Sequence, residues 1–261
     1  MKSDSERPAL SIGSAISESW ARLKPNLGTF ILAMLVGAGV SYLLSYFGGI
    51  INPDPGHANG TSFIFSILSL LVNVVFGIGL IRMAIKTVNG ERPLVSDLTY
   101  ALSDGDLFWR YLVTQVLLFV IVTLGLVALI IPGIYLFLTY AFAQYFVVDK
   151  GSSTSKAFHQ SAEMMNGNQL QFLGLVLALS IINVIGAALV GLGLFITLPL
   201  TAITMVHAYR QLSGTPPKAV EKKEDEDESG EQPKMINDME EKPVTKATPS
   251  DKAKTASKKK S

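Results

Sequence analysis

Side chains that commonly carry chemistry are few in this sequence. It contains no cysteine and three histidines, His57, His159 and His207. His57 has Asp54 as its one close potential ligand, whereas a zinc site usually takes about three or four. His207 lies near Tyr209 and Arg210 at the end of an apolar segment, which favours an anchor at the membrane interface over a proton relay. We therefore predict no metal site, no cofactor and no catalytic residue.

Three amide side chains lie inside long apolar segments, at Asn73, Gln115 and Asn183. An amide in hydrocarbon must find a partner, because leaving it unpaired costs several kcal/mol. The first interpretation is that these amides bind neighbouring helices together. The alternative is a polar lining for a solute path. A coupled transporter normally also carries a buried charge, and the apolar segments contain no Asp, Glu, Lys or Arg.

The composition around these residues is that of a membrane protein. Of the 261 residues, 49% are hydrophobic and 16% are charged, whereas a soluble domain carries about 25% charged residues. This balance excludes a soluble cytosolic enzyme, a nucleic-acid-binding protein and a secreted module held by disulfides. A membrane-crossing helix needs about 20 apolar residues. We predict an all-α polytopic membrane bundle of six transmembrane helices.

The six predicted spans form three hairpins. They run from Gly28 to Ile51, Phe63 to Ile81, Tyr111 to Ile131, Ile134 to Val148, Leu170 to Val190 and Leu192 to Tyr209. The fourth has 15 residues, which is also short enough for a re-entrant segment. The hairpin connections contain no Lys or Arg, so all 22 basic residues fall on one side. The positive-inside rule assigns that side to the cytoplasm, with both termini there. We expect a bacterial cytoplasmic (inner) membrane protein whose first span is an uncleaved anchor.

Glycine and proline mark the second and third hairpins. Pro132 and Gly133 form the predicted connection between the third and fourth spans. Gly191 connects the last two spans, with Gly193 and Pro199 close behind it. Proline lacks a backbone donor and glycine relaxes the backbone, so we predict breaks or kinks at these five positions.

Two stretches of the chain repeat one pattern of residues. Aligned without gaps, they share Ser11 and Ser153, Ala15 and Ala157, Ser19 and Ser161, Asn26 and Asn168, and Phe30 and Phe172. Each stretch has apolar residues at helical spacing and precedes a pair of spans. A weaker third copy places Leu94, Leu98, Ala101 and Leu102 on one face. We predict a cytoplasmic amphipathic helix before each hairpin, with Trp20 and Phe158, like Tyr209 and Arg210, at the membrane interface.

The run from Ile130 to Asn168 carries a family resemblance. An IPGIY hairpin leads into an aromatic helix, then VVD, then a Ser/Ala-rich helix that ends in an Asn/Gly turn. Together with the closing LPLTAITMVHAYRQL, this run resembles uncharacterised bacterial six-span integral membrane proteins. That group is similar to the membrane domain associated with glycerophosphodiester phosphodiesterases. The resemblance covers Leu10 to Leu212 and implies no particular activity. The catalytic barrel of those enzymes would need about 250 further residues, which the chain does not provide.

The sequence divides into a membrane domain, residues 1–212, and a charged cytoplasmic tail, residues 213–261. The tail runs from acidic (EKKEDEDESGE) to basic (DKAKTASKKKS) and has almost no apolar residues, so we predict that it is disordered. One interpretation is a solvated tail without a specific role. The other is docking of Lys252, Lys254 and Lys258 to Lys260 on anionic lipid or RNA.

These patterns indicate a protein that is not an enzyme. The sequence contains no nucleophile elbow, zinc motif or P-loop. We expect a scaffold or lipid-interacting membrane protein, with membrane lipids and other membrane proteins as partners and no nucleic-acid partner. The alternative is a transporter or channel for a small solute or lipid.

Overall fold

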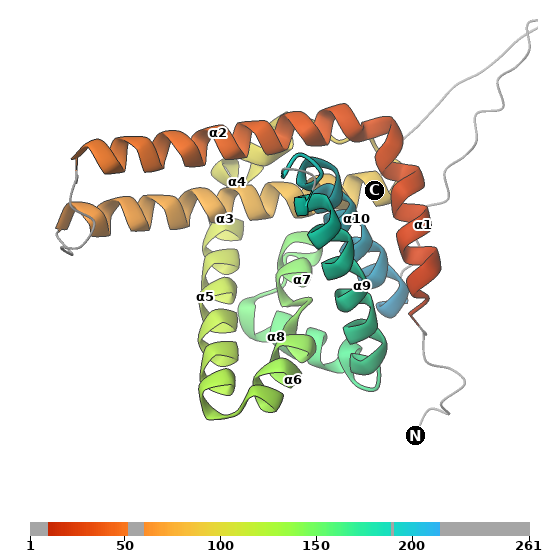
Figure 1. Ribbon diagram of the computed structural model, residues 1–261. Coiled ribbons are helices and arrows are strands. Elements are labelled where there is room, and N and C mark those ends of the chain that lie inside the picture. The colour runs from red at the N-terminus through yellow and green to blue at the C-terminus, as the bar shows by residue number, and fades with distance from the viewer. Residues whose placement is uncertain (1–9, 52–59, 189–190, 215–261) are drawn as a thin grey trace, which may run out of the picture. The chain divides into compact units, whose positions relative to one another are not determined.

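The computed structural model describes residues 10–51, 60–188 and 191–214. Within these ranges the chain is helical and contains no strand. The α-helices are α1 Ile12–Leu23, α2 Leu27–Ile51, α3 Gly60–Val88, α4 Tyr100–Ser103, α5 Gly105–Ala128, α6 Ile130–Tyr140, α7 Ala143–Lys150, α8 Thr154–Met165, α9 Gln169–Ala188 and α10 Leu194–Leu212 (Figure 1). Two 3₁₀ helices join them, η2 Lys24–Asn26 and η3 Val95–Thr99. The predicted tail from residue 215 onward lies outside the described residues.

Five segments of the described chain are long and apolar enough to cross a membrane, which is the pattern of a multi-pass membrane protein. They are Ile12–Ile50, Phe63–Val88, Gly105–Ala128, Ile130–Lys150 and Gln169–Ala188. The all-helical class is therefore confirmed, but the count of six spans is not. The predicted sixth span, Leu192 to Tyr209, falls largely on α10, which is not among the five. Helix α10 ends in a polar stretch whose side chains, including His207, Tyr209 and Arg210, are buried inside the protein.

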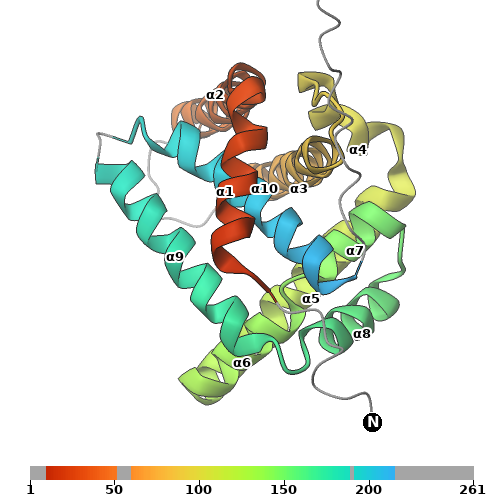
Figure 2. The ribbon, with the colours of Figure 1, turned by 90° about the vertical axis from the view of Figure 1, so that its right-hand side faces the viewer.

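The hairpins do not run along one common direction. Helices α2 and α3 lie side by side, and α5 packs closely against α6 (Figure 1). The α2–α3 pair runs across the direction of α5 in both Figure 1 and Figure 2. The predicted arrangement of six spans as three transmembrane hairpins is therefore not confirmed.

The second arm of each predicted hairpin supplies much of the core. Val74 and Ile78 of α3, Phe146 of α7 and Tyr209 of α10 belong to one buried cluster. The ring centroids of Phe146 and Tyr209 lie 5.1 Å apart. The first arms carry rows of exposed apolar side chains, among them Leu43 and Phe47 on α2, Phe119 on α5 and Ile181 on α9. Apolar side chains on this outer surface suit contact with lipid.

The elements between hairpins pack by one rule. Helix α8 packs on α6 and α7, and η3 with α4 packs on α3. Helix α1 packs on α10, which it crosses obliquely in Figure 2. The elements η3 with α4, and α8, therefore each cover the second arm of the hairpin before them. Helix α1 covers α10, the second arm of the last hairpin. The three second arms also end alike, in glycines with positive φ at Gly90, Gly151 and Gly214.

Helices α1 and α8 bury the same aligned positions. These are Ala15, Ser19 and Leu23 on α1, and Ala157, Ser161 and Met165 on α8. After each helix, the aligned asparagine makes the same backward hydrogen bond. The Asn26 side chain donates to the Arg22 carbonyl over 3.0 Å, and the Asn168 side chain donates to the Met164 carbonyl over 3.2 Å.

The third predicted amphipathic helix is not a single helix. Its residues form η3 and the four-residue α4. Leu98 and Ala101 are buried, but Leu94 and Leu102 are 56% and 70% exposed. The Asp97 carboxylate accepts a hydrogen bond from the Leu94 amide over 2.9 Å, which caps the tight 3₁₀ turn. The predicted apolar face of four residues is therefore wrong at two of them.

The fourth predicted span, Ile134 to Val148, is a broken helix. Helix α6 ends at Tyr140 and α7 begins at Ala143. The Ser161 hydroxyl from α8 donates to the Thr139 carbonyl over 2.9 Å and accepts from the Phe142 amide over 3.2 Å. One buried side chain thus satisfies backbone groups on both sides of the break, which a chain in an apolar interior requires.

Candidate functional site

The α5–α6 turn lies three residues earlier than the sequence predicts. Leu129 separates the two helices with extended backbone, and Pro132 and Gly133 lie inside the first turn of α6. Proline fits there because the first residues of a helix have no partner for a backbone N–H. Gly133 permits the close crossing, because a Cβ at Gly133 would lie 2.6 Å from the Leu126 backbone nitrogen. These residues therefore pack the hairpin and do not form its turn.

The α9–α10 turn follows the prediction more closely. Gly191 has φ +76°, in the left-handed region that favours glycine. At Gly193, a Cβ would lie 2.6 Å from the Gly186 Cα, so the two helices approach closely there. Pro199 is buried inside α10.

The three intramembrane amides have different surroundings. The Asn183 side chain donates to the Thr201 hydroxyl over 2.9 Å, which joins α9 to α10 as expected of interhelical binding. Asn73 is exposed and donates to the Ser69 carbonyl of its own helix over 2.8 Å. Within the described residues, no hydrogen bond from the Gln115 side chain is found. The three amides are therefore not brought together in one polar path.

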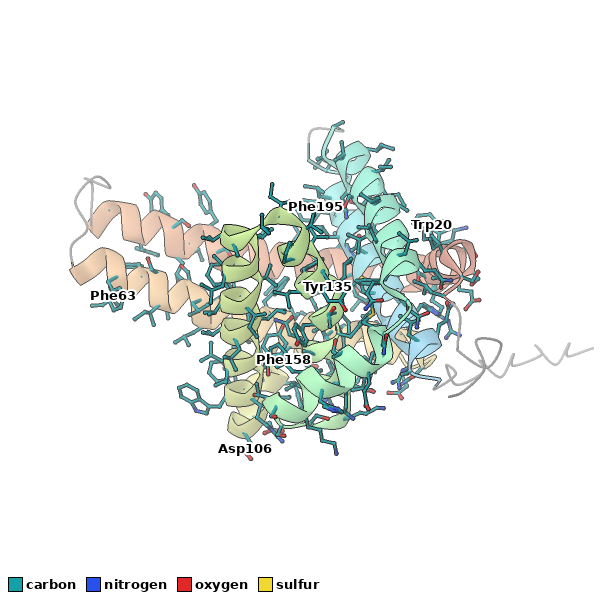
Figure 3. The ribbon with its side chains drawn as sticks, turned by 90° about the horizontal axis from the view of Figure 1, so that it is seen from below. Trp20, Phe63, Asp106, Tyr135, Phe158 and Phe195 are labelled. Atoms are coloured by element: carbon teal, nitrogen blue, oxygen red, sulfur yellow. The ribbon has the colours of Figure 1, made fainter. Side chains whose placement is uncertain are left out.

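Trp20 and Phe158 occupy different positions on their helices. Trp20 is 37% exposed on the outer side of α1, and the Lys24 ammonium lies 5.5 Å from its ring centroid (Figure 3). Phe158 packs on the buried cluster, and its ring centroid lies 5.1 Å from that of Tyr140. Trp20 is thus available to the surroundings, whereas Phe158 contributes mainly to internal packing.

Tyr209 and Arg210 are in the interior and not at the surface. Tyr209 is fully buried, and its hydroxyl donates to the Asp149 carboxylate over 2.9 Å. The Arg210 guanidinium donates to the other Asp149 oxygen over 2.8 Å, with 9% of its side chain exposed. This arrangement ties the end of α10 to the end of α7. Arg210 Nε has no hydrogen-bond partner, so the aspartate is the main compensation for this buried charge.

A second buried carboxylate ties η3 to α3. Asp97 accepts a hydrogen bond from the Lys86 ammonium over 2.6 Å. Arg82 Nε lies 3.6 Å from the same oxygen, and the Arg82 guanidinium lies 3.4 Å from the Tyr100 ring centroid. This cluster holds the connecting element against the second arm of the first hairpin.

The two histidines within the described residues each face one carboxylate. His57 lies outside the described residues. His159 is exposed and lies 3.5 Å from Glu163 on the same helix. His207 is buried, and its Nδ1 faces Glu18 of α1 at 3.6 Å. Within the described part of the chain, no group of three His, Asp or Glu residues could hold a metal ion.

An apolar groove of ≈ 400 Å³ lies beside the Asp97 cluster, between α2, α3, α4 and α5. Its lining includes Val40, Leu68, Val72, Leu98, Leu102 and Phe108. Leu98 and Thr99 of this lining follow Asp97, so the ion-pair cluster lies next to one end of the groove. An apolar surface of this kind suits a hydrocarbon chain. We name it the acyl groove.

The sequence patterns predict neither the acyl groove nor the aspartate clusters. The groove forms between segments that are far apart in the chain, so no local motif marks it. The aspartates carry a usable signal, because Asp149 follows two valines and Asp97 lies three residues after Leu94 in a sequence poor in charge. Such a carboxylate is expected to have a partner, because burying an unpaired charge is costly.

Comparison with known proteins gives no relative. No family model, no curated protein and no solved structure matches the chain.

Proposed function

We propose that this chain is a non-enzymatic, lipid-interacting scaffold of the bacterial cytoplasmic membrane. In this proposal six helices cross the membrane as three hairpins, with α10 as the sixth, and both termini are cytoplasmic. The resemblance to the membrane domain associated with glycerophosphodiester phosphodiesterases belongs to the same proposal. The partners are membrane lipids and other membrane proteins.

The observation that carries the proposal is the acyl groove. It is lined by apolar side chains from four helices and the adjoining η3, apart from Thr99. Gly37 of α2 forms part of its wall, which brings the α2 backbone close to the Phe76 ring of α3. A phospholipid acyl chain is the occupant that a membrane supplies at such a surface.

The scaffold part of the proposal rests on how the charged side chains are used. Asp149 is engaged with Tyr209 and Arg210, and Asp97 with Lys86. Each carboxylate joins one element to another and lies at most about one-tenth exposed. Charged groups used in this way stabilise an assembly of helices and leave no free acid–base pair in these two clusters.

A groove-filling variant tests the proposal. Leu68 lines the acyl groove on α3, whereas Leu70 is equally exposed on the same helix, 41% against 40%, and does not line it. The purified full-length protein would be irradiated in nanodiscs with a phospholipid that carries a photoreactive diazirine in its acyl chain. We expect Leu68→Trp to lower crosslinking of the lipid to peptides that contain the groove-lining residues by about fivefold. A loss of roughly 1 kcal/mol of apolar contact gives this change. Leu70→Trp should leave that crosslinking unchanged.

Equal crosslinking in both variants would contradict the acyl groove. The transporter alternative is tested with the same purified protein reconstituted into proteoliposomes. Reconstituted protein should give no more solute release from proteoliposomes than protein-free liposomes give. Solute flux that depends on the protein and is lost in Asn73→Ala would contradict a scaffold.

A further inference from the structure

We propose that a polar pocket at the start of the first hairpin binds the phosphate of an anionic phospholipid. This inference deepens the lipid interaction proposed above and rests on it. The pocket has a volume of ≈ 320 Å³ and lies between the end of α1, η2 and the turn after α3. Its lining includes Arg22, Pro25, Asn26, Thr87, Glu91 and Arg92.

The first cation of the pocket is held in place by the protein. Arg22 Nη1 donates to the Val88 carbonyl at the end of α3 over 2.7 Å. This bond caps the helix and orients the guanidinium, which presents five N–H donors in a planar fork. Within the described residues, Arg22 Nε and Nη2 have no hydrogen-bond partner. They can therefore donate to a phosphate without first losing another contact.

The second cation is exposed and lies on a constrained turn. Gly90 has φ +78°, and the Glu91 amide donates to the Lys86 carbonyl over 2.9 Å. Arg92 follows directly and is succeeded by the buried Pro93. In the described chain, Arg92 makes no hydrogen bond or ion pair. The turn thus holds a free guanidinium at the rim of a pocket that already contains Arg22.

The charge of the lining suits a phosphodiester. Arg22 and Arg92 contribute +2 and Glu91 contributes −1, which leaves +1. A single negative charge, as on a lipid phosphodiester, balances this total. Inorganic phosphate carries a second charge near neutral pH, and Glu91 would repel it more strongly.

The position of the pocket favours a lipid over a soluble anion. The apolar helix α2 begins at Leu27, one residue after Asn26 of the pocket lining. The exposed Trp20 lies two residues before Arg22 in the chain, with the Lys24 ammonium 5.5 Å from its ring centroid, and tryptophan prefers the headgroup region. A phosphate bound in the pocket would therefore lie at the level where the first hairpin enters the membrane.

The test measures lipid retention by full-length protein in a neutral detergent at physiological salt. Phosphatidylglycerol and diacylglycerol would be titrated, and bound lipid counted by native mass spectrometry. We expect phosphatidylglycerol to be retained more tightly than diacylglycerol. Arg92→Gln should weaken its retention by about fivefold to tenfold, the loss of one charged contact. Lys156→Gln removes the same charge at an exposed position of α8. It should change phosphatidylglycerol retention by less than about twofold.

Two further measurements identify the class of ligand and test the direction of the charge effect. Glu91→Gln should tighten phosphatidylglycerol retention, because it removes the one carboxylate of the lining. Excess inorganic phosphate should not displace the lipid. Displacement would overturn the lipid assignment and indicate a site for a soluble anion. Equal losses in Arg92→Gln and Lys156→Gln would overturn the pocket.

These failures are distinguishable from failure of the proposed function. If phosphatidylglycerol and diacylglycerol are retained equally and Leu68→Trp still lowers acyl crosslinking, the phosphate pocket is wrong and the acyl groove stands. If no variant retains any lipid, both proposals are wrong. Arg22 is left unchanged throughout, because its bond to the Val88 carbonyl also holds α3.

Discussion

At the scale of single residues, the buried aspartates are the clearest departures from an apolar membrane protein. The Asp149 carboxylate accepts hydrogen bonds from both Tyr209 and Arg210. Both donors lie on α10, 60 and 61 residues later in the chain. Removing one partner of a buried ion pair is strongly destabilising, because the other charge stays buried without compensation. The pair is therefore a sensitive place to test how the ends of α7 and α10 are held.

We expect Asp149→Ala to lower the free energy of unfolding by about 3 kcal/mol. The matched control is Asp106→Ala, since Asp106 is an exposed carboxylate in the first turn of α5. It should cost about 0.5 kcal/mol, the loss of a favourable charge at a helix N-terminus. Both values would come from reversible unfolding of the purified protein in mixed micelles. Similar small losses for the two variants would show that the Asp149–Arg210 pair does not hold the helices.

The sequence predicts part of this detail. It identified Asn183, which does join two helices, because an amide inside an apolar segment is conspicuous. It placed Tyr209 and Arg210 at the interface, because aromatic and basic residues after an apolar run usually anchor there. Their burial depends on Asp149, a partner that only the folded chain brings near.

At the scale of elements, α1 and α8 show how far a sequence pattern can predict packing. The aligned positions Ala15 and Ala157, and Ser19 and Ser161, are buried in both helices. The sequence pattern aligned these positions and assigned both helices to the membrane interface, but it did not predict that the aligned positions pack inside the protein. The pattern could not predict that η3 and α4 would replace a third such helix. In the folded chain, the hydrogen bond between Lys86 and Asp97 joins η3 to α3, which no local pattern predicts.

Ser161 provides a test at this scale, because it joins α8 to the break between α6 and α7. Ser161→Ala leaves the Phe142 amide buried without its partner, which costs about 2 kcal/mol. Ser155→Ala, at an exposed position of α8, should change stability by less than about 0.5 kcal/mol. Hydrogen exchange of the amides around residue 142 should rise in the first variant and not in the second. Unchanged exchange in Ser161→Ala would mean that the break is held by other contacts.

At the scale of the whole molecule, the proposal requires every connecting element to lie at the cytoplasmic face. The distribution of Lys and Arg predicts this arrangement, since all 22 fall on one side of a six-span chain. Hydropathy identifies five membrane-crossing segments but not α10. The second half of α10 carries polar side chains that are buried inside the protein. Whether α10 crosses the membrane decides on which side the C-terminal tail lies.

Cysteine accessibility in intact cells measures this directly, and the natural chain contains no cysteine to interfere. Single cysteines would replace Gly56 in the first hairpin connection, Ser155 on α8 and Ser250 in the tail. Each variant would be treated from outside with a membrane-impermeant maleimide, and again after permeabilisation to show that every site can react. The six-span account predicts that Gly56→Cys is labelled from outside, whereas Ser155→Cys and Ser250→Cys are labelled only after permeabilisation. Labelling of Ser250→Cys from outside, with Ser155→Cys still protected, would show that α10 does not cross and would contradict the account.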